Sequence, residues 1–260
     1  MILPFDALGE GEALVLLHAG LADRTMWREH LVPLAEAGRR VVAVDLPGFG
    51  EAGLQSGPQA PWDDVLETIA LLIGGPAALV GNSFGGAVAL RVAAIAPERV
   101  SALVLVSAPA PGIEPSPQLQ ATAQAEESAL ARGDVEGAIE AILAAWMLPD
   151  APPALRERVA AMQRRAFLLQ SASPEASEGP DPLENRLEAL ARIRAPALCA
   201  AGRRDMPDFL AAAQELARSL PDARHAVIAR AGHLAPLETP RAFRRLVLSF
   251  LADVESGRPG

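Results

Sequence analysis

A serine lies at the centre of the glycine-rich segment Gly-Asn-Ser-Phe-Gly-Gly, residues 81–86. The apolar run 77–80 precedes it, and a run of small and apolar residues with helical character follows it. A serine hydroxyl attacks well only when a sharp strand-to-helix turn holds it near a base and near free backbone amides. Glycines at 81 and 85 suit such a turn, because side chains would collide where strand and helix cross. An ordinary connection with a helix-capping serine is the alternative, but the strand-turn-helix setting favours Ser83 as a nucleophile.

A serine nucleophile needs a base, and His233 is the candidate. It lies in Ala-Gly-His-Leu, between a predicted strand and a predicted helix, where loop residues reach a catalytic face. A carboxylate that orients the imidazole could come from Asp205 or from Asp208, three residues later. Asp208 also resembles an N-cap for the helix that follows.

Two other patterns are weaker. The segment 48–53 fits Gly-x-Gly-x-x-Gly after a strand, but a proline- and glycine-containing loop follows it instead of the helix that a dinucleotide site needs. The four histidines have no close pair with metal-ligand spacing, and Cys199 is the only cysteine and lies in an apolar run. We therefore predict no metal, no cofactor and a buried Cys199.

The elements that must position Ser83 and His233 alternate along the chain. Short apolar runs predict strands and amphipathic stretches predict helices, which is typical of a mostly parallel sheet with helices on both faces. The predicted strands are 13–17, 41–44, 77–80, 102–106, 197–201 and, more weakly, 226–229. The predicted helices are 26–37, 62–73, 84–96, 208–219 and 240–254.

The alternation stops after Ser107, and a purely helical region extends to about residue 170. Its apolar residues have three-and-four spacing, which predicts two cap helices, one around 135–146 and one around 155–169. Residues 171–182 predict an exposed linker, and a further amphipathic helix follows at 183–193. We predict an α/β core at 1–110 and 183–260, with the cap and linker, 111–182, inserted between them.

The motifs and their order resemble the α/β-hydrolase family over nearly the whole chain. Besides the Ser83 turn, the resemblance rests on His-Ala-Gly at 18–20, Asp-Leu-Pro-Gly-Phe-Gly at 45–50, Gly-Arg-Arg-Asp at 202–205 and Gly-His-x-x-x-x-Glu-x-Pro at 232–240. It implies an α/β fold with a helical cap and a catalytic set of Ser83, Asp205 and His233. Asp205 is favoured over Asp208 because it matches the family's acid position.

The resemblance also implies an oxyanion hole built from the backbone amides of Phe84 and Gly20. Alanine at 19 replaces the family's usual glycine, so the second amide is that of Gly20 or of Leu21. His18 is expected to support this loop by hydrogen bonds without transferring a proton, and Asp45 is expected to be structural. Little sequence precedes the first strong strand, so the opening hairpin of the family is expected to be shortened or absent.

The leading functional prediction is a serine hydrolase of a small, uncharged carboxylic ester, lactone or thioester. C–C bond hydrolysis of a diketone, cofactor-free perhydrolysis and a receptor-like ligand-binding module with an intact triad remain alternatives. Substrate preference is expected to come from a pocket under the cap. Its candidate lining residues are Leu21, Trp27, Phe84, Trp146, Met147, Met162 and Phe167.

Composition limits the partners. Half of the residues are hydrophobic, and 23 basic residues, all arginine, against 32 acidic residues give a net charge of −9. Such a chain repels nucleic acid overall. Because no signal peptide or membrane span is evident, we expect a soluble cytoplasmic protein with a small-molecule substrate, while the oligomeric state is not predicted.

Overall fold

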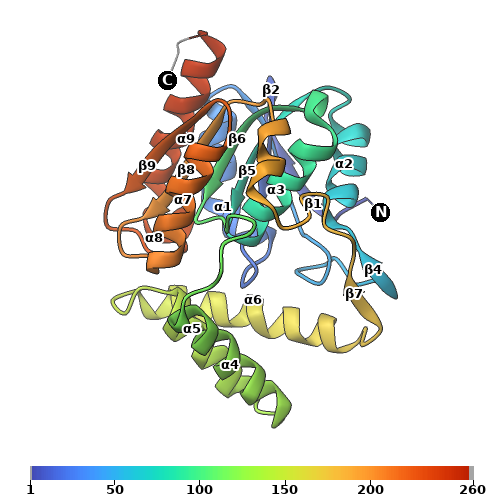
Figure 1. Cartoon of the computed structure of the whole chain (residues 1–260), viewed down its shortest axis with the longest axis vertical. Helices are drawn as coiled ribbons and strands as arrows, with labels where there is room; N and C mark the ends of the chain where they lie inside the picture. The colour runs from blue at the N-terminus through green and yellow to red at the C-terminus, as the bar shows by residue number, and fades with distance from the viewer. Residues whose placement is uncertain (1, 258–260) are drawn as a thin grey trace.

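A seven-stranded sheet with the order β1-β3-β2-β5-β6-β8-β9 forms the centre of the computed structural model, which describes residues 2–257 (Figure 1). Neighbouring strands in this sheet are parallel, except that β1 and β3 are antiparallel. The predicted α/β fold with a mostly parallel sheet is confirmed. The strands are β1 (Phe5–Leu8), β2 (Glu12–Leu17), β3 (Arg39–Val44), β5 (Ala77–Asn82), β6 (Val100–Val106), β8 (Ala197–Gly202) and β9 (Ala223–Ile228).

Helices cover both faces of the sheet, and the alternation along each strand decides which face a side chain meets. On β2, Leu14 and Leu16 belong to one buried cluster, whereas Val15 and Leu17 belong to the other. The first cluster includes side chains of α1 (Arg28–Glu36) and α9 (Pro240–Glu255). The second includes side chains of α2 (Pro61–Leu72), α3 (Phe84–Ile95) and α7 (Pro207–Ser219).

Three helices, α4 (Pro117–Ala131), α5 (Val135–Trp146) and α6 (Pro153–Ser171), lie between β6 and β8 in the chain and form a layer beyond one end of the core (Figure 1). Their buried residues include Ile139 and Ile142 of α5 and Val159 and Met162 of α6, at the spacing from which two of the helices were predicted. The exact division into core and cap domains stays a prediction.

Several elements differ from the expectation. A short antiparallel strand, β1, precedes β2, and β4 (Gly57–Gln59) pairs in parallel with β7 (Ala176–Glu178). Three-residue strands carry no recognisable periodicity, so the sequence did not indicate this small sheet. The helix predicted at 183–193 is only a 3₁₀ helix at Leu187–Arg192, because Glu184 and Asn185 both have φ of 49°.

Two shorter 3₁₀ helices, Arg24–Trp27 and Pro97–Arg99, and the single-turn α8 (Ala235–Glu238) complete the described elements. Within residues 2–257, none of the helices has the length and apolar character required to span a membrane.

Candidate active site

Ser83 occupies the turn between the end of β5 and the start of α3. Its backbone has φ of 52° and ψ of −114°, a conformation that costs a non-glycine residue about 1–3 kcal/mol. A hydrogen bond to the neighbouring strand β6 holds the turn, since the amide of Ser83 donates to the carbonyl of Val106 at 2.8 Å. The Ser83 side chain remains partly exposed. A strained serine at the carboxyl end of a central strand is therefore presented to solvent.

The glycines on either side of this serine are required by close packing, as predicted. A Cβ atom on Gly81 would lie 2.4 Å from the carbonyl carbon of Gly85. One on Gly85 would lie 2.2 Å from the carbonyl oxygen of Leu17 on β2. Any side chain at either position would force the strand and the helix apart and displace Ser83.

His233 and Asp205 form a shielded pair at the ends of β9 and β8. The imidazole Nδ1 lies 3.0 Å from Oδ1 and 3.2 Å from Oδ2 of Asp205, and the two side chains are 3% and 1% exposed. Asp205 also accepts a hydrogen bond from the amide of Met206 at 2.8 Å, which fixes the carboxylate. With Nδ1 facing a carboxylate, the proton lies on Nδ1 and Nε2 is free to accept one.

The other candidate acid, Asp208, lies elsewhere. Its carboxylate accepts hydrogen bonds of 2.8 Å from both the amide and the hydroxyl of Ser116, at the start of α4. The expectation that it caps α7 is wrong, because that helix begins at Pro207 and its N-cap is Met206. Asp208 instead connects α7 to the start of α4.

Asn82, the residue before Ser83, connects the turn to the histidine loop. Its side-chain amide donates to the carbonyl oxygens of Val106 and His233, both at 3.0 Å. The backbone that carries Ser83 and the backbone that carries His233 are thereby held together, although the described residues show no direct hydrogen bond between the two side chains. Sequence reasoning missed this role of Asn82, whose only signal was its position inside the motif.

Two aromatic rings enclose the imidazole of His233. Trp146, at the end of α5, lies 4.5 Å from it between ring centroids, and Phe209 of α7 lies 4.4 Å from it on an edge. The two aromatic rings are also 5.6 Å from each other. A cap residue therefore covers the histidine and leaves it only 3% exposed. The sequence proposed Trp146 as a pocket residue but gave no indication of Phe209.

Glu238 connects the histidine loop to the cap. Its carboxylate accepts hydrogen bonds from the amide of Gly232 at 2.6 Å and from the amide of Leu148, just after α5, at 3.2 Å. Burial raises the pKa of this carboxyl group above its ordinary value, against the opposing effect of the two amides. The loop that carries His233 and the segment after Trp146 are thus hydrogen-bonded to the two oxygens of one carboxylate.

On the other side of Ser83, the loop after β2 packs against the turn. The amide of Gly85 donates to the carbonyl of His18 at 3.0 Å, and a Cβ on Gly20 would lie 3.5 Å from that of Phe84. The amide of Phe84, the first residue of α3, has no acceptor within residues 2–257. Gly20 and Phe84, whose amides were predicted to form an oxyanion hole, therefore lie close together in space. The choice between the amide of Gly20 and that of Leu21 stays open.

His18 supports this loop as expected. The amide of Leu46 donates to its Nε2 at 2.9 Å, so its Nδ1 carries the proton and donates to the carbonyl of Ala19 at 2.8 Å. Burial lowers the pKa of His18, which keeps the ring neutral. Asp45 is structural as well, since its carboxylate accepts from the amides of Arg24 and Glu51.

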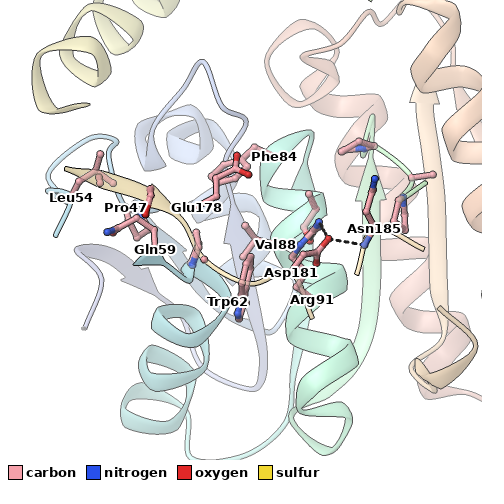
Figure 2. A pocket seen from close by; sticks show the side chains of 18 of the residues that line it. Pro47, Leu54, Gln59, Trp62, Phe84, Val88, Arg91, Glu178, Asp181 and Asn185 are labelled. Atoms are coloured by element: carbon pink, nitrogen blue, oxygen red, sulfur yellow. Dashed lines mark hydrogen bonds and ion pairs between the residues drawn. The ribbon is translucent and has the colours of Figure 1, made fainter. Parts of the chain in front are cut away.

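Two cavities flank the turn. The larger, of about 770 Å³, lies beside Phe84 and is bordered by α2, α3 and the segment 176–185 (Figure 2). The smaller, of about 180 Å³, lies beside His233 and Asp205 and is lined by Trp146 and Met147.

The remaining predicted lining residues lie elsewhere. Leu21, Met162 and Phe167 are buried and border neither cavity. Trp27 is fully buried between His30 and Phe243, on the face of the sheet that α1 and α9 cover. Trp27 also borders neither cavity, and its assignment to a substrate pocket stays a prediction, since large apolar side chains at helical spacing lie in the core as readily as in a pocket.

The described residues offer no site for a metal, since no group of three or more metal-ligating side chains comes together within 2–257. Cys199 is buried in β8, and burial raises the pKa of its thiol to about 12. It therefore stays protonated near neutral pH, as suits a core residue.

Known proteins resemble this chain over most of its length. A family model described as the alpha/beta hydrolase family matches residues 14–246. A 2-hydroxy-6-oxononadienedioate/2-hydroxy-6-oxononatrienedioate hydrolase of Burkholderia vietnamiensis is 31% identical, over 95% of this chain and 90% of the relative. A pimeloyl-[acyl-carrier protein] methyl ester esterase of Aeromonas hydrophila is 29% identical, over 96% of this chain and 100% of the relative. A solved esterase from Thermogutta terrifontis has 26% identity and a TM-score of 0.79, over 97% of this chain and 93% of the other.

Proposed function

The chain belongs to the alpha/beta hydrolase family, and we propose that within it the protein is a serine hydrolase of small, uncharged carboxylic esters, lactones or thioesters. The observation that carries this proposal is the shielded His233–Asp205 pair, whose histidine backbone is tied by Asn82 to the strained turn at Ser83. Similarity to an esterase of Aeromonas hydrophila supports the same reaction class.

In this proposal Ser83 attacks the carbonyl carbon while Nε2 of His233 takes its proton. Asp205 stabilises the imidazolium, and the amides of Phe84 and of Gly20 or Leu21 hold the oxyanion. His233 then protonates the leaving alcohol, and an acyl group remains on Ser83. Water, activated by the same imidazole, hydrolyses this ester and restores the serine.

C–C bond hydrolysis is a second candidate. It is favoured by the similarity, at 31% identity, to a hydrolase whose name specifies 2-hydroxy-6-oxononadienedioate. The same three side chains would serve it, so the substrate and not the catalytic set separates the two reactions. Perhydrolysis and ligand binding without turnover remain predictions.

A panel of p-nitrophenyl esters, run beside a vinylogous 1,5-diketone, tests the assignment. We expect steady multiple turnover of the esters and a loss of about 10³-fold or more in Ser83→Ala. Ser101→Ala, at an exposed serine on β6, is the matched control and should keep wild-type rates. Turnover that survives in Ser83→Ala would remove the nucleophile, and a faster diketone reaction would favour the second candidate.

A further inference from the structure

We propose that the 770 Å³ cavity beside Phe84 binds an extended, uncharged apolar arm of the substrate whose carbonyl reacts at Ser83. The inference rests on the proposed function and adds to it the substrate's shape and polarity. Three observations carry it: the place of the cavity relative to Ser83, its length along α3, and an apolar lining whose one cation is already paired.

The cavity lies at the same edge of the sheet as the candidate site. Among its lining residues, Pro47, Phe84 and Pro109 follow the carboxyl ends of β3, β5 and β6. This edge is where open α/β sheets bind ligands. Asp205 and His233 follow β8 and β9, which lie beyond β6 in the sheet order. Ser83 directly precedes Phe84, which lines the cavity, and Asn82 on its other side is hydrogen-bonded to the backbone of His233, so the serine lies between the large cavity and the histidine loop.

The cavity follows one face of α3 away from Ser83. Phe84, Val88 and Arg91 line it at helical spacing, with Trp62 of α2 beside them and Asp181 against Arg91 at the far end (Figure 2). From Phe84 to Arg91 the helix rises about 10 Å. Because an extended carbon chain advances by roughly 1.3 Å per bond, this length suits an arm of roughly eight carbons.

Most of the lining is apolar, and its one cationic side chain is already paired. Prolines, aliphatic residues and two aromatic rings make up most of the wall. Arg91, the one cationic lining residue, forms an ion pair of 2.8 Å with Asp181 and donates to the carbonyl of Ala87 at 3.0 Å. Its guanidinium carbon also lies 5.7 Å from the Trp62 ring.

A second carboxylate, Glu178, lines the cavity as well. The lining charges therefore sum to −1, from Arg91 against Asp181 and Glu178. A terminal carboxylate on the arm would be repelled and would lack a free cation, whereas an alkyl or aryl arm would bury apolar surface.

The test is a chain-length series of p-nitrophenyl esters, from acetate to octanoate, with the monoester of octanedioic acid as the charged probe. In the wild type we expect kcat/KM for octanoate to exceed that for acetate by about 10-fold or more and to exceed that for the charged monoester by a similar factor. Equal rates across the series, or a preference for the charged monoester, would overturn the proposal.

Two variants narrow the cavity from walls remote from Ser83. Ala176→Phe acts from β7 and Leu119→Trp from α4, and both residues line the cavity. Each should lower kcat/KM for octanoate by about 10-fold and leave that for acetate within about 2-fold. Ala172→Phe, at an exposed alanine outside the lining, is the matched control and should change neither. Both cavity variants hydrolysing octanoate like the wild type would exclude this cavity as the arm site.

A binding measurement separates this inference from the proposed function. Decan-2-one, a neutral unreactive ketone, is titrated into Ser83→Ala and into Ser83→Ala/Ala176→Phe, and intrinsic tryptophan fluorescence is followed because Trp62 lines the cavity. We expect saturable binding that weakens by about 10-fold in the double variant. Equal affinity in both overturns the arm site, even if no ester proves to be a substrate. Failure of ester turnover alone overturns only the proposed reaction.

Discussion

Ser83, Asp205 and His233 come from three strand ends that are far apart in the chain. Sequence motifs indicated all three, because glycines at a strand-to-helix turn and polar residues after buried strands leave a recognisable pattern. The pairing of Asp205 with His233 at 3.0 Å is visible only in the structure. So is the aromatic cover of the imidazole, since the contact of Trp146 with Phe209 depends on how the cap packs on the core. No local pattern in the sequence encodes that packing.

Trp146 should influence catalysis through its contact with His233. An aromatic face against an imidazolium stabilises the cation by about 0.5–2 kcal/mol, which corresponds to roughly 3- to 30-fold in rate. We expect Trp146→Ala to lower kcat for p-nitrophenyl acetate by such a factor, whereas Trp146→Phe should retain most of the wild-type kcat. Steady-state kinetics of the two variants provide the measurement. Wild-type kcat in Trp146→Ala would show that the ring only fills space.

At the scale of elements, the six main strands and five core helices were predicted to within a few residues, because buried parallel strands and amphipathic helices have distinct periods. The β4–β7 pair and the 3₁₀ helix at Leu187–Arg192 were not. Both depend on long-range contacts: β4 pairs with β7, and the side chain of Asn185, just before the 3₁₀ helix, accepts a hydrogen bond from the amide of Gly112. The β4–β7 pair forms part of the wall of the larger cavity.

Glu238 should matter as a connection between elements. Replacing it with glutamine puts an amide donor opposite the amide of Gly232 or of Leu148, so one hydrogen bond becomes a clash of donors. We expect Glu238→Gln to lower the free energy of unfolding by about 1–3 kcal/mol, measured by urea denaturation at pH 7. Glu98→Gln, at an exposed glutamate, is the control and should leave it unchanged. Equal midpoints for both variants would contradict this role.

At the scale of the whole molecule, the candidate site lies between two cavities of unequal size, which residues of α4–α6 and of the loops after the strands line together. Family resemblance predicted the general arrangement, but not which residues line each cavity. Four of the seven residues proposed for the lining border neither cavity: Leu21, Trp27, Met162 and Phe167. Amphipathic spacing shows that a side chain is buried, and it does not distinguish a packed interior from a cavity wall.

The stability of the whole fold should depend on pH through His30. Burial lowers the pKa of this histidine to about 4, and its Nε2 bonds to the carbonyl of Pro236. The unfolded chain, with a pKa near 6.5, binds the proton more tightly, so stability falls as pH drops from 6.5 toward 4. The full decrease in the free energy of unfolding is about 3 kcal/mol.

Urea unfolding at intervals between pH 4 and pH 7 measures this dependence. His30→Gln should be less stable at pH 7 but should lose much less stability on acidification than the wild type. His225→Gln, at an exposed histidine on β9, should keep the wild-type slope. An unchanged slope in His30→Gln would assign the acid sensitivity to other groups.

The central claim is that Ser83 becomes covalently acylated with help from His233. Mass spectrometry of the intact chain after exposure to a fluorophosphonate, followed by peptide mapping, tests it most directly. We predict one adduct per chain, located on the peptide that contains Ser83, absent in Ser83→Ala and formed at least about 10²-fold more slowly in His233→Ala. An adduct on another residue, or equal labelling of Ser83→Ala, would contradict the account.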